Sequence, residues 1–477
     1  MQTLTFDIAI IGAGSAGITA LRAAQAHGKR AVIIESGPYG TTCARVGCMP
    51  SKLLISAADA AHAVRAASAF GVHAGPLNVD GRAVMDRVRA ERDRFVRFVV
   101  DGMERIDPDA RLIGHARFLA PGLLQIGDDA QVHAERIVIA TGSRPVIPEN
   151  LRGLGDRLVV NDDVFDWDAL PDSVAVVGTG AIGLELGQAL SRLGVRVRLF
   201  GRSGRLAQLQ DAEVTAAARA CLGSELDLRL DTDIVAARRT NDGVSLVSRD
   251  ADGGERSDSY QFVLAAVGRA PNVAGLGLEH SGLRLNRHGV PIHDPHTMQC
   301  GDSPVFIAGD VAEERLLQHE AVDEGRIAGE NAARFPQVTA GTRRAALSIT
   351  FTDPQIATVG QVSRSLAESR YEAGAVSFEK QGRSRVMLQN RGLLKVYGEH
   401  GSHRFLGAEM IGPRAEHLAH LLAWACQNGM TVGQMLEMPF YHPVVEEGVR
   451  TALRELKEKL VRHVEPLEHC ADCTPGL

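Results

Sequence analysis

Apolar residues run almost without interruption through two short segments, and each segment ends at a cluster of glycines. Residues 6–11 and 173–177 are mostly aliphatic, which is typical of strands that are buried on both faces of a parallel sheet. Each is followed by the spacing Gly-x-Gly-x-x-Gly, then by a stretch with helical spacing, and then by a second aliphatic run. The pattern therefore predicts two strand–helix–strand units of the dinucleotide-binding type.

The first glycine cluster comprises Gly12, Gly14 and Gly17. Gly12 suits a tight turn, Gly14 lets the backbone approach a pyrophosphate, and Gly17 lets helix and strand pack closely. The helix that begins here directs unpaired N–H groups and the positive end of its dipole at a phosphate. Glu35 ends the second strand, where its carboxylate can accept hydrogen bonds from a ribose. We therefore expect a dinucleotide site in this first unit.

The second glycine cluster, Gly178, Gly180 and Gly183, repeats the arrangement, but its second strand ends at Gly201 instead of an acid. Arg202 follows directly, with another arginine three positions later. Without a carboxylate there is no acceptor for a ribose 2′-hydroxyl and no repulsion of a 2′-phosphate, which Arg202 could bind. This favours NADP(H) over NAD(H), unless both arginines are merely solvated. Two such sites indicate one tightly held FAD and one exchangeable nicotinamide.

Composition narrows the class of protein further. The 477 residues exceed a single core, and 45% hydrophobic with 23% charged residues indicate a folded globular chain. The net charge of −6 offers no broad basic surface for nucleic acid, and no apolar run approaches the ~20 residues of a membrane span. We see no targeting segment and expect a cytoplasmic protein. Seven cysteines are too few for a disulfide scaffold, so close pairs indicate redox or metal chemistry.

One close pair, Cys43 and Cys48, precedes a helix predicted at 52–70. On an ideal helix, residues five apart are separated by ~7.5 Å along the axis. A disulfide requires Cα atoms roughly 4.4–6.8 Å apart, so the turn must be irregular, and Gly47 and Pro50 supply that irregularity. A thiolate at the start of a helix also has a lowered pKa, which suits thiol exchange.

Motifs along nearly the whole chain resemble those of the class I pyridine nucleotide-disulfide oxidoreductases, and most closely the dihydrolipoyl dehydrogenases among them. The resemblance implies an α/β fold with two Rossmann-like domains, for FAD and NAD(P), and a C-terminal α+β dimerisation domain. It is carried by Gly12–Gly14–Gly17 with Glu35 and by residues 42–52, 140–145, 178–185, 267–272, 305–310, 351–360 and 442–447.

The resemblance also implies the roles of individual residues. Hydride would pass from nicotinamide to one face of the flavin, and electrons would leave from the other face to the disulfide. Cys48 would contact the flavin as the charge-transfer thiolate, and Cys43 would exchange with substrate sulfur. His442, oriented by Glu447, would manage protons near neutral pH. In this family His442 would come from the partner subunit, so we expect a homodimer.

Further residues are assigned to the cofactors by the same resemblance. Lys52 and Glu185 would pair beside the flavin, although either residue alone is an ordinary helix residue. Three departures from the family pattern are Arg45 for asparagine, Thr41 for glycine, and Phe440 for a frequent histidine. The remaining cofactor-binding residues implied are Thr42, Thr141, Gly142, Gly268 and Asp310.

The substrate is the least defined prediction. Dihydrolipoyl groups, free or on a carrier protein, come first, but Arg202 is unlike the acid that typical dihydrolipoyl dehydrogenases carry. The alternative is an NADPH-dependent disulfide or mercuric-ion reductase in which Cys470 and Cys473 act as relay or soft-metal thiols, unless these are incidental. A third reading is a redox-responsive assembly subunit of a 2-oxo-acid dehydrogenase complex.

The expected organisation follows the motifs. Residues 1–150 form the first FAD segment, 151–272 the NAD(P) domain, 273–345 the second FAD segment, and 346–477 an interface domain with an antiparallel sheet. Further helices are predicted at 81–106 and 415–427 from their apolar spacing.

Overall fold

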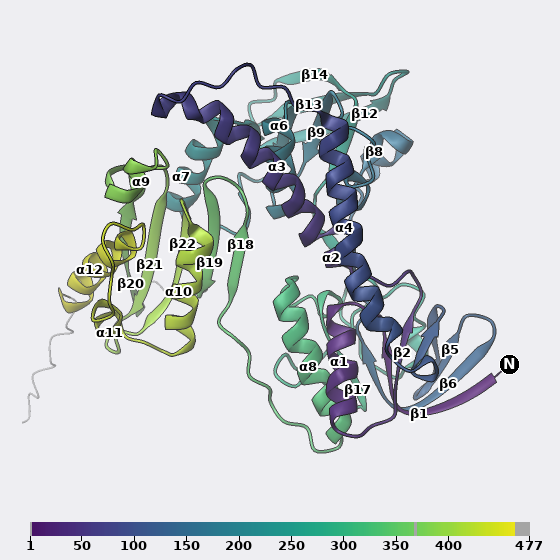
Figure 1. Cartoon of the computed structure of the whole chain (residues 1–477). Helices are drawn as coiled ribbons and strands as arrows, with labels where there is room; N and C mark the ends of the chain where they lie inside the picture. Colours follow the sequence, from purple (N-terminus) through teal and green to yellow (C-terminus); the bar gives the residue numbers. More distant parts are fainter. Residues whose placement is uncertain (1, 367–369, 463–477) are drawn as a thin grey trace, which may run out of the picture. The chain divides into compact units, whose positions relative to one another are not determined.

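The computed structural model describes residues 2–366 and 370–462 (Figure 1). Its contacts divide the chain into two compact units. The first unit comprises the residues up to Gly178, Leu186–Phe200 and Thr232–Arg343, and the second comprises Thr179–Glu185, Gly201–Asp231 and the residues from Arg344 onward. None of the described helices is both long and apolar enough to cross a bilayer.

A mainly parallel sheet forms the centre of the first unit. The adjacent residues of β1 belong to different cores: Ile8 and Ile10 pack on one face of the sheet, and Ala9 and Ile11 pack on the other. Burial on both faces explains the uninterrupted apolar run of this strand. In spatial order the sheet contains β3 (Arg111–Ile113), β2 (Ala31–Glu35), β1 (Gln2–Ile11), β6 (Ala130–Ile139), β5 (Leu123–Ile126) and β4 (Ala116–Ala120), with β17 (Val305–Ile307) beside β6.

Helices α1 (Ser15–Ala26) and α8 (Gln318–Arg334) pack closely against each other beside this sheet (Figure 1). A Cβ added to Gly325 would lie 2.2 Å from the Ala16 carbonyl oxygen, and one at Gly329 would lie 2.4 Å from that of Ala20. Since no side chain fits at these distances, the two glycines allow the backbones to approach. This contact places the middle of α8 against α1, the helix that begins directly after Gly14.

The second predicted strand–helix–strand unit is also confirmed. Four parallel strands lie in the order β10 (Arg196–Gly201), β9 (Ser173–Val177), β15 (Phe262–Ala265) and β8 (Leu158–Val159), and α6 (Ala181–Arg192) follows the glycine cluster. An antiparallel meander, β12 (Thr232–Arg239), β13 (Val244–Asp250) and β14 (Glu255–Tyr260), shares their core.

The cysteine motif lies at the junction of two helices. The short helix α2 (Thr42–Val46) ends at Gly47, and the long α3 (Cys48–Ala66) begins at once. The predicted helix at 52–70 is confirmed, with an earlier start and a 3₁₀ turn over its last residues. The helix predicted at 81–106 is α4 (Gly81–Glu104), which Asp80 caps by accepting two backbone N–H groups.

The second unit contains an antiparallel sheet, as predicted for the C-terminal part. Its order is β18 (Leu347–Thr350), β19 (Gln355–Gly360), β22 (Phe405–Gly412), β21 (Leu393–Glu399) and β20 (Tyr371–Ser377). The helix predicted at 415–427 is confirmed as α10 (Ala415–Gln427) and packs on the core of this sheet. The other helices of this unit are α7 (Ala212–Gly223), α9 (Gly382–Val386), α11 (Val432–Leu436) and α12 (Glu447–Arg462).

Candidate active site

A cavity of about 550 Å³ opens at the carboxyl ends of β1 and β2 in the first unit. Ligands in open parallel sheets bind at this edge, so the cavity lies where a dinucleotide is expected. It is lined by six of the residues predicted to bind FAD: Gly12, Gly14, Glu35, Thr42, Thr141 and Gly142. Pro38, His115, Arg144 and Asn272 also line it and were not predicted.

Each of the three glycines of the first cluster is required, or permitted, for a different structural reason. Gly12 has φ 106°, and a Cβ there would lie 2.3 Å from the Ala140 carbonyl oxygen. A Cβ at Gly17 would lie 1.9 Å from the Gly12 carbonyl oxygen, so helix and turn could not pack as closely. A Cβ at Gly14 would meet nothing within 4 Å, because Gly14 faces the open cavity. The bare backbone there fits the pyrophosphate of a dinucleotide.

Glu35 connects the glycine turn to the loop after β2. Its Oε2 accepts the backbone N–H of Ala13 at 2.8 Å, and its Oε1 accepts that of Gly37 at 2.9 Å. A carboxylate has about four acceptor positions, so each oxygen can still accept a ribose hydroxyl. Glu35 is therefore suited both to shape the turn and to bind the ribose.

Thr141 and Gly142 are held by Asn272, a residue of the same unit that comes much later in the sequence. The Thr141 hydroxyl donates to the Asn272 carbonyl oxygen at 2.7 Å, and the Asn272 side chain donates to the Thr141 carbonyl oxygen at 3.0 Å. The Gly142 carbonyl oxygen accepts the backbone N–H of Asn272 at 2.9 Å. Gly268 accepts the backbone N–H of Val146 at 3.0 Å, beside the antiparallel pair β7 (Ser143–Pro145) and β16 (Arg269–Pro271).

Asp310 follows β17 and is half-buried. Its Oδ2 accepts the Ser143 hydroxyl at 2.6 Å, and Ser143 in turn accepts Arg269 Nε at 2.8 Å. Asp310 does not line the cavity, so its predicted contact with the ribityl chain stays a prediction. Ser143 was missed by the sequence reasoning, because a lone serine in a short strand carries no signal for such a contact.

Two departures from the family pattern lie in the cavity wall. Thr41 has φ 58°, a region that favours glycine, and its hydroxyl accepts the backbone N–H of Ala44 at 3.3 Å as the N-cap of α2. Arg45 also lines the cavity, and its Nη1 donates to the Pro38 carbonyl oxygen at 3.5 Å. Thr41 therefore caps the helix at a position where the family usually has glycine, and Arg45 places a positive charge where the family usually has asparagine.

Cys43 and Cys48 are both in the thiol form, and their side chains are hydrogen-bonded to each other. Cys43 is half-buried in α2, whereas Cys48 is exposed at the start of α3. At the break between the two helices, Gly47 lies close to the backbone of α2, because a Cβ there would lie 3.0 Å from the Thr42 carbonyl oxygen and 3.3 Å from the Cα atom of Cys43. The hydrogen bond from Cys48, followed by burial, raises the pKa of the Cys43 thiol, while the charge of Lys52 lowers it. The expected irregular turn is therefore confirmed.

Lys52 and Glu185 have contacts in their own units. Lys52 lies one turn after Cys48 in α3, and its Nζ donates to the Ser51 hydroxyl at 3.5 Å. Glu185 is 6% exposed in α6, and its Oε1 accepts the backbone N–H of Phe351 at 2.9 Å. The predicted pairing of Lys52 with Glu185 beside a flavin stays a prediction.

His442 and Glu447 meet at the start of α12. The Nδ1 atom of His442 is 3.1 Å from both carboxylate oxygens of Glu447, which also accepts Arg450 Nη2 at 3.1 Å and the Val444 backbone N–H at 3.3 Å. The hydrogen bond from His442 lowers the pKa of Glu447, so the carboxylate stays ionised. The imidazole is 81% exposed, leaving Nε2 open to a partner. Phe440 packs on the core of the second unit, with its ring 5.5 Å from the Arg450 guanidinium.

The second glycine cluster shows the same backbone constraints as the first. Gly178 has φ 119°, and a Cβ there would lie 2.2 Å from the Ala266 carbonyl oxygen. A Cβ at Gly180 would meet nothing within 4 Å. At the end of β10, a Cβ on Gly201 would lie 2.8 Å from the hydroxyl of Thr179. The Gly201 position therefore has no room for a side chain while Thr179 stays in place.

Of the remaining predicted residues, the structure describes two, Gly183 and Arg202. Gly183 lies in the first turn of α6, and Arg202 is exposed directly after β10. Cys470 and Cys473 lie outside the described residues. The donors and turns around the first cavity fit FAD, and those after β9 fit a second dinucleotide.

Comparison with known proteins defines the class. Residues 6–325 match the family model "Pyridine nucleotide-disulphide oxidoreductase", and residues 347–453 match the dimerisation domain of the same family. The chain belongs to the pyridine nucleotide-disulphide oxidoreductases, flavoproteins that use FAD and NAD(P). The dimerisation domain supports a homodimer.

Individual relatives cover nearly the whole chain. A dihydrolipoyl dehydrogenase of Thermus scotoductus is 31% identical over 472 residues, covering 96% of this chain and 98% of its own. A mercuric reductase of Streptomyces lividans is 30% identical, with 98% of each chain covered. Two solved structures share the fold, each with a TM-score of 0.80. They are LpdA of Mycobacterium tuberculosis (24% identity, covering 96% of this chain and 100% of that one) and the Cu(II) complex of the HOCl-induced flavoprotein disulfide reductase RclA of Escherichia coli (21%, covering 94% and 99%).

Proposed function

We propose that the protein oxidises dihydrolipoyl groups and passes the electrons to a nicotinamide, as a dihydrolipoyl dehydrogenase does. The observation that carries the proposal is the hydrogen-bonded Cys43–Cys48 pair at the start of α3. Thr42, the neighbour of Cys43 in α2, lines the cavity suited to FAD. Relatives named dihydrolipoyl dehydrogenase support this substrate class.

The cysteines exchange sulfur bonds with the substrate in two balanced steps. A substrate thiol loses its proton to His442, its sulfur attacks Cys43 Sγ of the oxidised pair, and Cys48 leaves as a thiolate. The second substrate thiol attacks the substrate sulfur bound to Cys43, which closes the substrate disulfide and transfers its proton to Cys43. Two electrons then lie on the cysteine pair, one proton on Cys43 and one on His442.

The environment of each residue suits its role. The raised pKa of Cys43, caused first by the hydrogen bond with Cys48 and then by burial, keeps the proton on Cys43 after exchange. Cys48 then carries the negative charge, one helical turn from Lys52. FAD, when bound, supplies the two-electron carrier between this thiolate and the nicotinamide. The exposed His442 suits a thiol pair on the partner subunit of a homodimer.

Gly201 and Arg202 support NADP(H) as the nicotinamide. An acid that would hold a 2′-hydroxyl is absent at this position, and Arg202 is exposed where it can bind a 2′-phosphate. This feature also supports a second candidate function, an NADPH-dependent disulfide or mercuric-ion reductase, and a relative named mercuric reductase supports it too. Cys470 and Cys473 would serve that reaction as relay thiols.

The domain assignment of the sequence, with FAD segments at 1–150 and 273–345, a nicotinamide domain at 151–272 and an interface domain at 346–477, belongs to the same proposal. We also propose that the protein is cytoplasmic and that it associates with a 2-oxo-acid dehydrogenase complex. The third candidate function is a redox-responsive assembly role in such a complex.

A turnover matrix tests these functions. Purified protein with FAD is assayed with NAD⁺ and NADP⁺ against dihydrolipoamide, and with NADH and NADPH against lipoamide, glutathione disulfide and mercuric ion. We expect dihydrolipoamide and lipoamide to give the highest kcat/KM. Mercuric ion as the best acceptor, with loss of activity in the Cys470→Ser/Cys473→Ser variant, would establish the reductase instead. If neither nicotinamide reduces the flavin anaerobically, the assembly role remains.

A further inference from the structure

A second cavity, of about 640 Å³, lies in the second unit between the segment 203–210, the first turns of α7 and the 3₁₀ turn Ser363–Ser365. Its volume is in the range of small-molecule sites, roughly 300–1,000 Å³. Three arginines line it, Arg205, Arg219 and Arg364, each from a different segment. We call it the arginine pocket.

The arginine pocket is strongly cationic. Among the described residues that line it there is no aspartate or glutamate. Arg219 is paired with Asp231 at 3.1 Å, but both side chains are about half exposed, so the pairing is weak and exchangeable. Arg205 and Arg364 are exposed as well. Serine, threonine and glutamine side chains complete the wall and can donate further hydrogen bonds: Ser203, Gln208, Gln210 and Thr215.

Two walls of the arginine pocket are fixed by one buried carboxylate. Glu409 of β22 has 0% exposure, and its Oε2 accepts the backbone N–H groups of Gln210 at 2.6 Å and Asp211 at 3.1 Å. Its Oε1 accepts the backbone N–H of Ser363 at 2.9 Å. Gln210 lines the pocket, and Ser363 precedes the pocket residue Arg364. A single side chain therefore holds the segments that carry the arginines in a set position.

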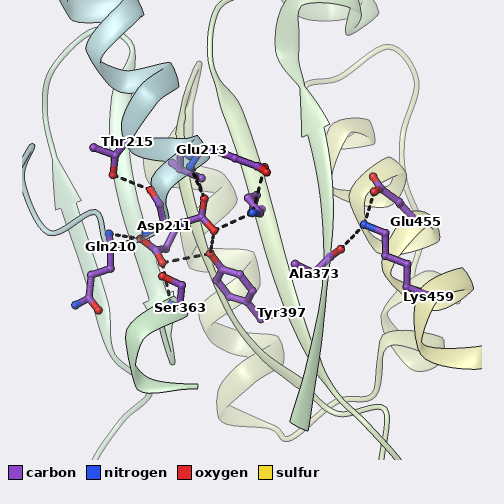
Figure 2. Close-up of polar contacts among 12 residues, drawn as sticks. Gln210, Asp211, Glu213, Thr215, Ser363, Ala373, Tyr397, Glu455 and Lys459 are labelled. Atoms are coloured by element: carbon purple, nitrogen blue, oxygen red, sulfur yellow. Dashed lines mark hydrogen bonds and ion pairs between the residues drawn. The ribbon is translucent and has the colours of Figure 1, made fainter. Parts of the chain in front are cut away.

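Asp211, the acid next to the pocket residue Gln210, is paired with other groups, so its negative charge does not cancel the positive charge of the pocket. Figure 2 shows the side chains of Asp211 and Tyr397 pointing toward one another. The Tyr397 hydroxyl lies 3.3 Å from Asp211 Oδ2 and 3.2 Å from Glu409 Oε1, and it can donate to either. Lys395 Nζ is 2.8 Å from Asp211 and 3.2 Å from Glu213. Asp211 also accepts two backbone N–H groups of α7 as its N-cap.

We propose that the arginine pocket binds the phosphate group of a small phosphorylated molecule. Guanidinium groups bind phosphate oxygens in a bidentate manner, which a single lysine cannot do. Three guanidinium groups around one cavity of fixed shape form a receptor for a multiply charged oxyanion. The ligand we expect is a small phosphorylated metabolite separate from the nicotinamide, because Arg202, the residue assigned to the 2′-phosphate, does not line the arginine pocket.

Isothermal titration calorimetry on the FAD-loaded protein tests the proposal, with inorganic pyrophosphate as the first probe and 2′,5′-ADP as the second. The variants Arg219→Gln and Arg364→Gln each remove one pocket cation. Arg238→Gln is the matched control, because Arg238 is an exposed arginine of β12 in the other unit. We expect each pocket variant to weaken pyrophosphate binding about tenfold, and the control to leave it unchanged.

The second probe separates the proposed ligand from the nicotinamide. If only pyrophosphate binding weakens in the pocket variants, the ligand is a separate metabolite, as proposed. If 2′,5′-ADP binding weakens in parallel, the pocket belongs to the nicotinamide site and the proposal is overturned. Equal pyrophosphate affinity in the wild type and in both pocket variants overturns the proposal. Dihydrolipoamide turnover of the same preparations distinguishes the failure of this proposal from the failure of the proposed function. Absence of turnover with intact pyrophosphate binding contradicts only the proposed function.

Discussion

Glu324 of α8 accepts the backbone N–H of Gly309 at 2.9 Å, so a fully buried carboxylate holds the residue just before Asp310. Burial raises the pKa of Glu324 to about 7, although the ion pair with Arg343 at 2.9 Å opposes the rise. Gly309 has φ 80°, so its loop has a shape that depends on such fixing contacts.

This pKa predicts a dependence of stability on pH. Because the folded pKa of about 7 lies above the ordinary value of 4.5, the contribution of Glu324 is complete below pH 4.5 and is lost as the pH rises through 7. Between the two values it amounts to on the order of 3 kcal/mol. Glu324→Gln cannot ionise, so the free energy of unfolding should fall less steeply with pH in this variant. Urea unfolding at a series of pH values measures this; parallel profiles for both proteins would refute it.

Cys43→Ser and Cys48→Ser should each lower dithiol turnover at least 1,000-fold, on the order of the loss that follows removal of a catalytic nucleophile. A hydroxyl has the size of a thiol but cannot form the exchanging sulfur bond. Cys426→Ser is the control, since Cys426 Sγ donates to the Leu406 carbonyl oxygen and a serine hydroxyl can do the same. Steady-state rates with dihydrolipoamide give the comparison. Comparable losses in all three variants would point to general destabilisation.

Glu447→Gln should reduce kcat about 10- to 100-fold and change its pH profile, because the amide no longer holds His442 with a negative charge. The neighbouring Glu446→Gln serves as the control of equal charge change. A Glu447 variant with an unchanged pH profile would mean that the carboxylate serves only the fold. The measurement is kcat against pH with saturating dithiol.

Thr41 allows backbone strain to be separated from capping. Thr41→Ala keeps φ 58° and loses the hydroxyl that caps α2, so it should be less stable by about 1 kcal/mol. Thr41→Gly loses the same cap but relaxes the backbone, so it should be more stable than the alanine variant by roughly 1–3 kcal/mol. Thermal unfolding of the two variants with FAD bound tests this order. Alanine equal to or above glycine would contradict it.

Gly201→Glu should not convert the cofactor preference to NADH by itself, because its Cβ would lie 2.8 Å from the Thr179 hydroxyl. Thr179→Ala/Gly201→Glu removes the obstructing atoms and supplies the acid. We expect the double variant to raise the ratio of kcat/KM for NADH over NADPH about tenfold, and the single Gly201→Glu to lower both values. Conversion by the single variant would show that the loop moves freely.

The repeating local features were predictable from sequence. The strands before Gly12 and Gly178 are buried on both faces and end at a turn that only glycine permits. The first constraint requires a run of aliphatic residues and the second a glycine, so both can be recognised within a few adjacent residues of the sequence. The helix at 415–427 was predictable for the same reason, because one apolar face is enough to specify it. The contact of Cys43 with Cys48 followed from Gly47 between them.

Contacts that join distant segments were not predictable. Glu320, Asp323 and Glu324 are acids in a helix, which normally indicates a solvated face, yet all three are buried. Glu320 and Glu324 are compensated by Arg343, which lies beyond the end of their helix. Glu409 likewise holds backbone groups whose N–H donors leave no trace in the side-chain pattern. Such partners are defined only when the chain has folded.

The contact between Thr179 and the empty Cβ position of Gly201 also restricts how this sequence can evolve. A mutation that places an acid at 201 first must pass through a poorly packed intermediate. A mutation that shortens Thr179 first leaves a small void and loses one hydrogen bond, from the Thr179 hydroxyl to the Arg205 carbonyl oxygen. A lineage that exchanges one nicotinamide for the other should therefore acquire its substitutions in a fixed order, with the glycine-loop residue changing before the end of β10.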